Sequence, residues 1–317
     1  MKVHELLQQT AKTLFTLELL PPVKGSSFDE IAATLEPLLE FNPAYVNITS
    51  HRADTIVVKG VDSIAQKRIV KKRPGTVSIA AAIKYKYGIE AVPHLICGGF
   101  TKEETEDALI DLNFLSIQNI LALRGDKRKE DDCFVSEENG HTHAIDILRQ
   151  VKKMNEGVYL HPEISNAVAT DFSVGVAGYP EKHSEAASLE TDLGHLKQKV
   201  AAGADYIVTQ MFFDNAAFVR FAEACRGAGI NVPIVPGLKP LSVKRQLEIL
   251  PSTFHIAIPE ALRREVEKCE NDKEVRQVGV EWAVQQCEEL KRMGVPALHF
   301  YTMGKPDSIV KICREVF

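Results

Sequence analysis

The 317-residue sequence lacks the patterns that mark several large classes of protein. No apolar stretch reaches the roughly 18 residues of a membrane span, and the N-terminus has no apolar segment of signal-peptide length. The net charge of −5 gives no excess of basic residues, which nucleic-acid-binding proteins usually carry. We therefore expect a cytoplasmic protein that binds neither membranes nor nucleic acid.

Support for metal, disulfide or Rossmann-type chemistry is also lacking. The six cysteines are scattered, without a Cys-X-X-Cys pair or zinc-finger spacing to histidines, so we interpret them as reduced, mostly structural thiols. No GxGxxG motif follows a predicted strand, which excludes the usual dinucleotide cradle. No serine or cysteine nucleophile with a partnering histidine stands out. We expect no metal site.

The sequence does contain a regular alternation of short apolar runs and amphipathic stretches. The runs are rich in β-branched residues, as strands buried on both faces should be. Eight strands are predicted at 14–19, 44–49, 92–97, 119–123, 172–177, 205–209, 232–236 and 297–301. Helices are predicted at about 28–40, 76–87, from 101 onward, and at 142–154, 188–202, 214–228, 242–250 and 306–315.

Eight strand–helix units without a break in composition predict one α/β domain over residues 1–317, a closed (β/α)8 TIM barrel. Residues 259–293 predict one or two extra helices before the last strand. The polar stretches 127–141 and 160–171 are expected to be loops.

Polar residues follow the predicted strands at their C-terminal ends, where chemistry gathers in such a barrel. They include Glu18, Thr49 to His51, His94, Arg124 to Asp126, Tyr179 to His183, Thr209, Gln210, Tyr301 and Thr302. Each residue alone has a structural explanation, such as an ion pair for Glu18 or a satisfied core histidine for His94. A purely structural interpretation of the whole set would require all of these explanations to be true together at one end of the barrel. One acid lies on the first strand and one follows the fourth. Such a pair is suited to binding a polar heterocycle and transferring one proton, and a cofactor would then supply the remaining chemistry.

Eight motifs, in order over about residues 14–310, together resemble the methylenetetrahydrofolate reductases. They are LELLPP (17–22), VNIT (46–49), PHLIC (93–97), LALRGD (121–126), AGYPEKH (177–183), DYIVTQMFFD (205–214), IVPGLKP (234–240) and LHFYT (298–302). The length resembles the bacterial form, a catalytic barrel without a C-terminal regulatory domain, so we expect no segment for an allosteric effector.

The resemblance implies FAD at the barrel mouth and a ping-pong reaction. NADH or NADPH would reduce the flavin, and 5,10-methylenetetrahydrofolate would then reoxidise it and become 5-methyltetrahydrofolate for methionine synthesis. It also implies a homo-oligomer, such as the tetramer of bacterial relatives. The preference between NADH and NADPH stays open.

The resemblance also assigns roles to residues. Glu18 matches the general acid that opens the five-membered ring of the folate, and its apolar neighbours would raise its pKa above the usual value of about 4.3. Asp126 matches an aspartate near flavin and pterin. Matched substrate contacts are Gln210, Gln246, Lys305 and, for the nicotinamide, Thr49. Matched flavin contacts are Ser50, Arg52, His94, Arg124, Gly125, Asp126, His143, Tyr179, His183, Ala186, Asp192, His195, Gln198 and Lys199.

Several of these positions depart from the family pattern. Leucines replace the aromatic residues of the first motif, and His143 stands where an aromatic ring often stacks on the flavin. His195 and Gln198 replace Asn and Arg, and Lys305 replaces an Arg, which keeps the charge without the planar fork. These departures affect the adenine and ribose contacts and the choice of electron donor.

Two other interpretations stay open. One is a different barrel enzyme, either a flavin-dependent dehydrogenase of the proline-oxidising kind or a folate-binding methyltransferase. The absence of an arginine pair in residues 297–308 counts against the dehydrogenase. The other is a non-enzymatic barrel that serves as a partner subunit or scaffold, against which the joint presence of Glu18, Asp126 and Gln210 argues.

Overall fold

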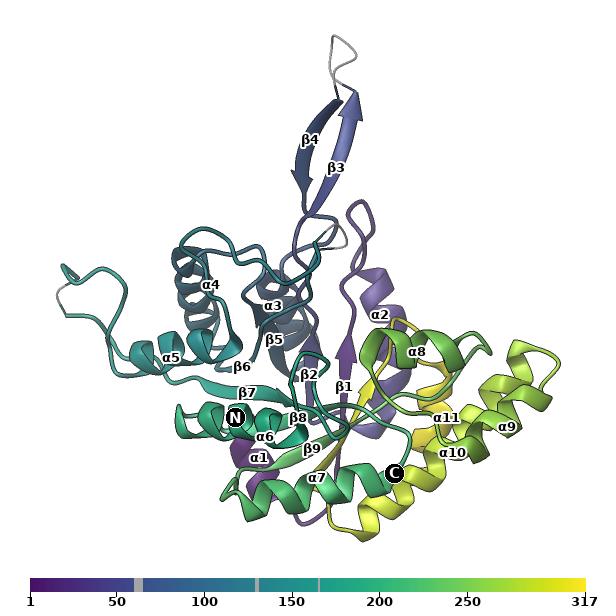
Figure 1. Ribbon diagram of the computed structural model, residues 1–317. Helices are drawn as coiled ribbons and strands as arrows, with labels where there is room; N and C mark the ends of the chain where they lie inside the picture. Colours follow the sequence, from purple (N-terminus) through teal and green to yellow (C-terminus); the bar gives the residue numbers. More distant parts are fainter. Residues whose placement is uncertain (60–64, 129–130, 165) are drawn as a thin grey trace.

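The computed structural model describes residues 1–59, 65–128, 131–164 and 166–317. Eight parallel strands close into a barrel in which each strand pairs with its neighbours and the last pairs with the first (Figure 1). The strands are β1 (Leu14–Leu19), β2 (Tyr45–Ile48), β5 (Glu90–Ile96), β6 (Asn119–Leu123), β7 (Ser173–Gly178), β8 (Tyr206–Met211), β9 (Ile234–Leu238) and β10 (Ala297–Tyr301). The predicted (β/α)8 barrel is confirmed, and β1, β6 and β10 have the predicted bounds.

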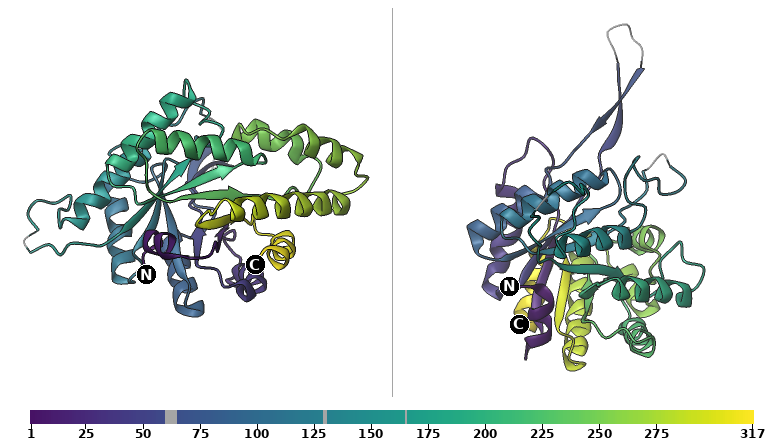
Figure 2. Two further views of the ribbon diagram at one scale, coloured as in Figure 1. Left: turned by 90° about the horizontal axis from the view of Figure 1, so that it is seen from below. Right: turned by 90° about the vertical axis from the view of Figure 1, so that its left-hand side faces the viewer.

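The helices that follow the strands surround the barrel (Figure 2). They are α2 (Asp29–Leu35), α3 (Thr76–Tyr87), α4 (Lys102–Phe114), α5 (Ala144–Asn155), α6 (Leu189–Ala201), α7 (Asn215–Gly227), α8 (Gln246–Phe254) and α11 (Asp307–Val316). Two extra helices precede the last strand as predicted, α9 (Glu260–Lys268) and α10 (Asp272–Arg292). The predicted capping box is present, because Thr101 and Glu104 exchange hydrogen bonds at the start of α4.

The helix predicted over 28–40 is wrong in its second half. After α2 the chain tightens into the 3-10 helix η1 (Glu36–Phe41), which has Pro37 in its first turn. A proline has no backbone N–H to donate, and its ring clashes with the preceding turn of an α-helix. The periodic leucines of this segment therefore face the core without forming a continuous α-helix.

Two elements were not predicted. The strands β3 (Asp54–Lys59) and β4 (Ala65–Val70) form an antiparallel pair that stands away from the barrel (Figure 1). Helix α1 (Val3–Gln9) lies under the barrel at the N-terminal ends of the strands (Figure 2). There Val3 and Leu7 pack against interior side chains, and the N–H of Val3 donates to Oδ1 of Asn119 at 2.8 Å. Because α1 closes this end, the open mouth lies at the other end.

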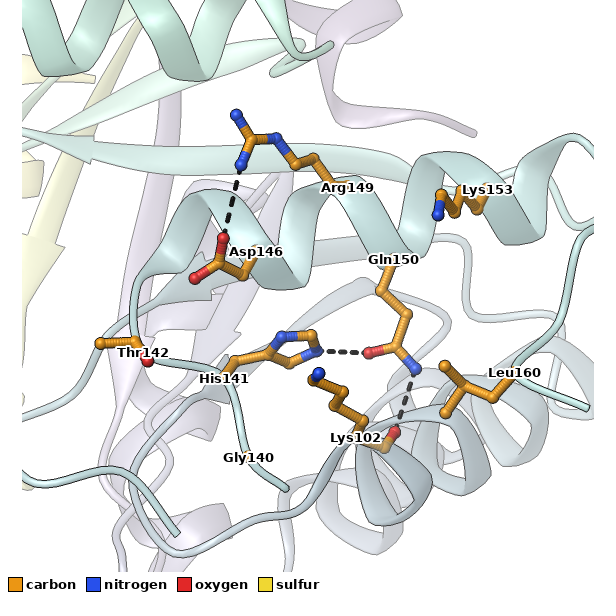
Figure 3. Close-up of a pocket in the computed structure, with 9 residues that line it drawn as sticks. All are labelled: Lys102, Gly140, His141, Thr142, Asp146, Arg149, Gln150, Lys153 and Leu160. Atoms are coloured by element: carbon orange, nitrogen blue, oxygen red, sulfur yellow. Dashed lines mark hydrogen bonds and ion pairs between the residues drawn. The ribbon is translucent and has the colours of Figure 1, made fainter. Parts of the chain in front are cut away.

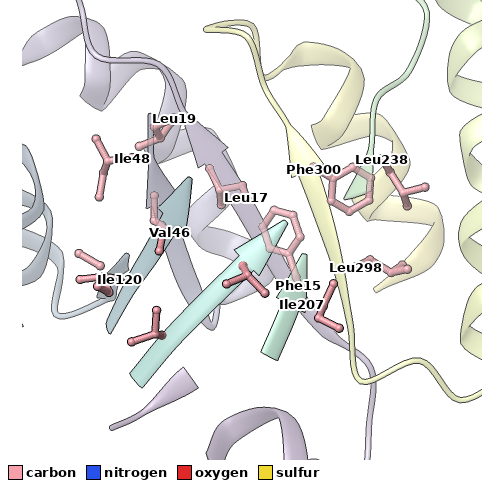
Figure 4. Close-up of a cluster of buried hydrophobic side chains, with 14 of the residues drawn as sticks. Phe15, Leu17, Leu19, Val46, Ile48, Ile120, Ile207, Leu238, Leu298 and Phe300 are labelled. Atoms are coloured by element: carbon pink, nitrogen blue, oxygen red, sulfur yellow. The ribbon is translucent and has the colours of Figure 1, made fainter. Parts of the chain in front are cut away.

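The alternation of side chains along β1 separates the core from the barrel interior. Phe15, Leu17 and Leu19 point outward and pack in the main apolar core, together with residues such as Val46 and Phe300 (Figure 4). Each such side chain, when fully buried, contributes about 1.5–3 kcal/mol to stability. Because successive residues of a strand face opposite sides, Glu18 must point into the barrel.

Candidate active site

Glu18 lies at the C-terminal end of β1, in register with Asn47 of β2 and Tyr301 of β10. Its side chain is 14% exposed. Burial disfavours the carboxylate and raises the pKa of Glu18 from 4.5 to about 8. At neutral pH the carboxyl therefore keeps its proton and can donate it to a bound molecule.

The nearest basic group to Glu18 is a neutral histidine. Nε2 of His94 lies 3.6 Å from Oε2 of Glu18. Burial, together with the nearby His299 and His51, lowers the pKa of His94 to about 3. The pair is a protonated carboxyl beside a neutral imidazole, so no ion pair holds Glu18 in its ionised form.

The turn after β6 brings Arg124, Gly125 and Asp126 to the same mouth. Gly125 has a φ of +82°, and a Cβ there would lie 3.3 Å from Cβ of Ile96, so this tight turn favours glycine. Arg124 makes a two-pronged ion pair with Glu185, with N–O distances of 2.6 and 2.7 Å. This hydrogen-bonded pair raises the pKa of Arg124 and lowers that of Glu185.

Asp126 is close enough to influence residues on both sides of the mouth. Burial lowers the pKa of His51, and the negative charge of Asp126 opposes that effect. Burial, together with the negative charges of Asp192 and Asp126, raises the pKa of Tyr179 to about 12. The structure therefore places a carboxylate between the loops that follow β2 and β7.

An arginine cluster occupies the part of the mouth next to Asp126. Arg52 and Arg128 each donate to Oε1 of Glu137, at 3.1 and 2.9 Å. The ring of Phe134 lies between the guanidinium groups of Arg52 and Arg124, at 5.9 and 5.0 Å from its centroid. Within the described residues, Nε and Nη1 of Arg52 and Nε of Arg128 are buried without a hydrogen-bond partner.

These spare donors fit a ligand rich in acceptor oxygens, such as the pyrophosphate of FAD. The side chain of Arg52 is only 10% exposed, and a buried guanidinium with unused donors is costly without such a ligand. Of this cluster, Arg52 and Arg124 were predicted, whereas Arg128, Phe134 and Glu137 were missed. The only signal for them was an aromatic residue among charges in the loop 127–141.

The loop after β7 and helix α6 bring together a second group of predicted residues. The rings of Tyr179 and His183 meet edge to face with centroids 4.7 Å apart, and the N–H of His183 donates to Asp192 at 2.9 Å. Nζ of Lys199 donates to the carbonyl of Ala177 at 2.8 Å, and burial lowers the pKa of Lys199 to about 8. These groups could bind the sugar and phosphate oxygens of a nucleotide.

Other predicted flavin contacts lie farther out. His195 and Gln198 are exposed on α6, whereas Ala186 is buried. His143 precedes α5 with its ring 65% exposed and its Nδ1 3.8 Å from Asp146. Stacking of His143 on a flavin stays a prediction. Thr49 and Ser50, after β2, are partly exposed at the mouth.

The β8–β10 half of the mouth carries the predicted substrate contacts. Oε1 of Gln210 accepts from the N–H of Met211 at 2.9 Å, and Oε1 of Gln246 accepts from the N–H of Ser242 at 2.7 Å. Both amides are therefore held in place by the backbone. Lys305 is exposed in the loop after β10.

Two further residues lie in this half: Tyr301, which was predicted at a strand end, and Lys239, which was not singled out from the sequence. The hydroxyl of Tyr301 donates to the carbonyl of Thr209 at 2.6 Å, next to Glu18. Lys239, directly after β9, is buried. A lysine in an apolar motif was the one available signal, because buried lysines are rare without a partner or a function.

A cavity of about 340 Å³ lies elsewhere, between α4 and α5 (Figure 3). It is lined by Lys102, Arg149 and Lys153, and by His141, whose Nε2 is hydrogen-bonded to Oε1 of Gln150. None of the predicted site residues lines it. We therefore place the candidate active site at the barrel mouth.

The described residues contain no group of three or more His, Cys, Asp or Glu side chains placed to hold a metal ion. In the same part of the chain, no helix has the length and apolar character needed to cross a membrane.

A closed parallel barrel with a protonated acid and spare arginine donors at its C-terminal mouth is typical of barrel enzymes that hold a phosphate-bearing ligand there. The comparison with known families is specific. The family model described as methylenetetrahydrofolate reductase matches residues 2–316, so the chain belongs to the methylenetetrahydrofolate reductase family, a family of oxidoreductases.

Relatives from plants and bacteria agree with this assignment. Methylenetetrahydrofolate reductase (NADH) 1 of Arabidopsis thaliana is 30% identical over 325 residues, which cover 99% of this chain and 50% of that protein. The 5,10-methylenetetrahydrofolate reductase of Escherichia coli (strain K12) is 30% identical over 302 residues, which cover 95% of this chain and 90% of that protein. The chain thus spans about half the length of the plant relative.

Solved structures share the fold at low sequence identity. A Clostridium thermocellum protein described as binding two copies of 5-methyl-5,6,7,8-tetrahydrofolic acid has a TM-score of 0.58 and 14% identity, over 98% of this chain and 96% of that one. A 2,3-dimethylmalate lyase has a TM-score of 0.53 and 9% identity, over 98% and 82% of the two chains. At these identities the likeness shows the barrel fold alone.

Proposed function

We propose that this protein reduces 5,10-methylenetetrahydrofolate to 5-methyltetrahydrofolate with NADH or NADPH, through FAD held at the barrel mouth. The observation that carries the proposal is Glu18, a buried carboxyl that stays protonated at neutral pH inside the mouth of a barrel of this family. A proton donor at that place is what ring opening of the folate requires.

Glu18 donates its proton to one of the two folate nitrogens that the methylene carbon joins. The bond between that nitrogen and the methylene carbon then breaks, and the carbon is left as an iminium ion on the other nitrogen. The neutral His94, 3.6 Å away, gives the resulting carboxylate a polar neighbour without a competing charge. Asp126 supplies negative charge at the mouth, which favours the cationic folate.

FAD, when bound, supplies the hydride transfer between nicotinamide and folate. Arg52, Arg124 and Arg128 would hold its pyrophosphate, since two of them have buried donors without partners among the described residues. Lys199 and the His183 loop would hold the remaining sugar and phosphate oxygens. Gln210 and Gln246, both fixed by backbone hydrogen bonds, would bind the pterin on the opposite side.

The test separates the two half-reactions in the absence of oxygen. Wild-type protein loaded with FAD should lose its flavin absorption with NADH and regain it with methylenetetrahydrofolate. Glu18→Gln should keep the first step and slow the second by about 10²- to 10⁴-fold, because only the second needs the proton. Glu260→Gln, which changes an exposed ion pair on α9, is the matched control.

Equal loss of both steps in Glu18→Gln would remove the general-acid role. A protein that binds no FAD would refute the proposal and favour the methyltransferase or scaffold interpretation.

A further inference from the structure

Lys239 is a mostly buried cation at the barrel mouth, and it has no counter-ion among the described residues. The residue is 9% exposed. It forms no hydrogen bond or ion pair with any residue that the structure describes. Its Nζ atom is not fully enclosed, so an anion in the mouth can reach it. Removing an ammonium group from most of its water without a partner is unfavourable, so a lysine in this state points to an anion that arrives with a ligand.

The position of Lys239 relates it directly to Glu18. Val235 packs inside the barrel, and a Cβ at Gly237 would lie 2.7 Å from the ring of Tyr301, so Lys239 is next on the inner face of β9. The register pairs Phe300 with Leu238, and its continuation brings Lys239 opposite Tyr301. Tyr301 is in turn paired with Glu18.

Two strand spacings of about 4.8 Å therefore separate the backbones of Lys239 and Glu18, or ~10 Å in total. Lys305, from the loop after β10, is the second cation near Lys239. Burial, together with the positive charge of Lys305, lowers the pKa of Lys239 to about 8. Two lysines thus share one part of the mouth, and the backbone of Lys239 lies ~10 Å from that of Glu18.

We propose that Lys239, together with Lys305, binds a carboxylate of the glutamate tail of the folate. This inference rests on the proposed function. The aminobenzoyl group of a folate separates the reacting nitrogens from the glutamate carboxylates, so acid and tail must be held by different residues. Lys239 has the positive charge that the tail requires, and it stands two strands away from Glu18 on the inner face of the barrel.

The division of the mouth favours a folate carboxylate over a dinucleotide phosphate as the anion. The buried arginine donors that suit phosphate lie on the β2, β5 and β6 side, around Phe134 and Glu137. Lys239 lies on the β8–β10 side with Gln210. A lysine also acts as a compact point charge, whereas planar two-pronged binding of phosphate favours arginine.

The test is a thermodynamic cycle that combines removal of the Lys239 side chain with removal of the glutamate from the ligand. Binding of 5-methyltetrahydrofolate is compared with binding of the N-methylamide of 5-methyltetrahydropteroate, which lacks the glutamate and carries no carboxylate, by calorimetry on the FAD-loaded protein without oxygen. Wild type should bind the folate about 10- to 100-fold more tightly, the range for a charge-assisted hydrogen bond. Lys239→Met should lose this preference and keep the wild-type affinity for the pteroate amide.

Lys311→Met, which removes an exposed lysine on α11, makes the same charge change and should keep the full preference. Lys239→Met should unfold without ligand at the same temperature as wild type or higher, because methionine removes a buried unpaired charge. That measurement separates a lost contact from a damaged fold.

Three results would overturn the inference. Lys239→Met could keep the preference for the folate, or it could lower the affinity for both ligands equally. It could instead raise the KM for NADH in flavin reduction, which would assign the lysine to a dinucleotide phosphate. If the wild-type protein binds FAD but neither folate ligand and is not reoxidised by methylenetetrahydrofolate, the proposed function itself fails and this inference with it.

Discussion

Replacing Glu18 by glutamine should stabilise the fold, and the gain should grow with pH. In the folded chain the carboxyl has a pKa of about 8, against 4.5 for an exposed glutamate. Below pH 4.5 both states carry the proton and the group has no effect on stability. Between pH 4.5 and 8 the unfolded chain releases the proton and the folded chain keeps it, so folding becomes less favourable as pH rises.

The magnitude follows from the interval between the two pKa values. Each pH unit within it is worth about 1.4 kcal/mol, so the carboxyl should destabilise the native state by about 5 kcal/mol above pH 8. Glutamine has nearly the same shape and no charge to bury. The difference in unfolding free energy between Glu18→Gln and wild type should therefore rise from near zero at pH 4.5 to this value at pH 8.

The assay is urea unfolding of the ligand-free protein at several pH values between 5 and 8.5, followed by fluorescence. Glu260→Gln, from an exposed pair on α9, should differ from wild type by a constant amount across this range. A flat difference for Glu18→Gln would show that the carboxyl is ionised in the folded protein. The buried general acid would then have to be abandoned.

Two further predictions concern the mouth. Arg52→Met should weaken FAD binding by about 10- to 100-fold in a fluorescence titration, because the phosphate oxygens of FAD lose the buried N–H donors of Arg52. Arg149→Met, at the cavity of Figure 3, should leave FAD binding unchanged. Gly125→Ala should cost about 1–2 kcal/mol in urea unfolding, because alanine is strained at a φ of +82° and its Cβ meets Ile96; a neutral result would show that the turn can relax.

Much of the fold could be predicted from the sequence because the signals are local. Strands buried on both faces appear as short apolar runs, and the capping box at Thr101 marks a helix start within four residues. Local patterns failed to predict the secondary structure where a single residue or tertiary packing overrides them. Pro37 breaks the helix predicted over 28–40, and α1 owes its place to Asn119, more than a hundred residues away.

The pair β3–β4 was missed for a different reason. A standard (β/α)8 barrel has no place for an extra hairpin between its second and third strands, so its two β-branched runs were not assigned. The alternation of strands and helices alone gives no sign of an insertion of this kind.

For the site, the sequence by itself determined which polar residues end the strands, because the C-terminal ends of parallel strands must meet at one mouth. Glu18, Arg124, Asp126 and Gln210 follow from that rule. Only the tertiary structure decided how these residues combine. Glu18 pairs with a neutral His94, and among the described residues Arg52 has unused donors and Lys239 has no partner. These features depend on burial and on distances between residues far apart in the chain. A sequence lists charges, whereas desolvation by the surrounding fold sets their protonation and leaves some of them in need of a ligand.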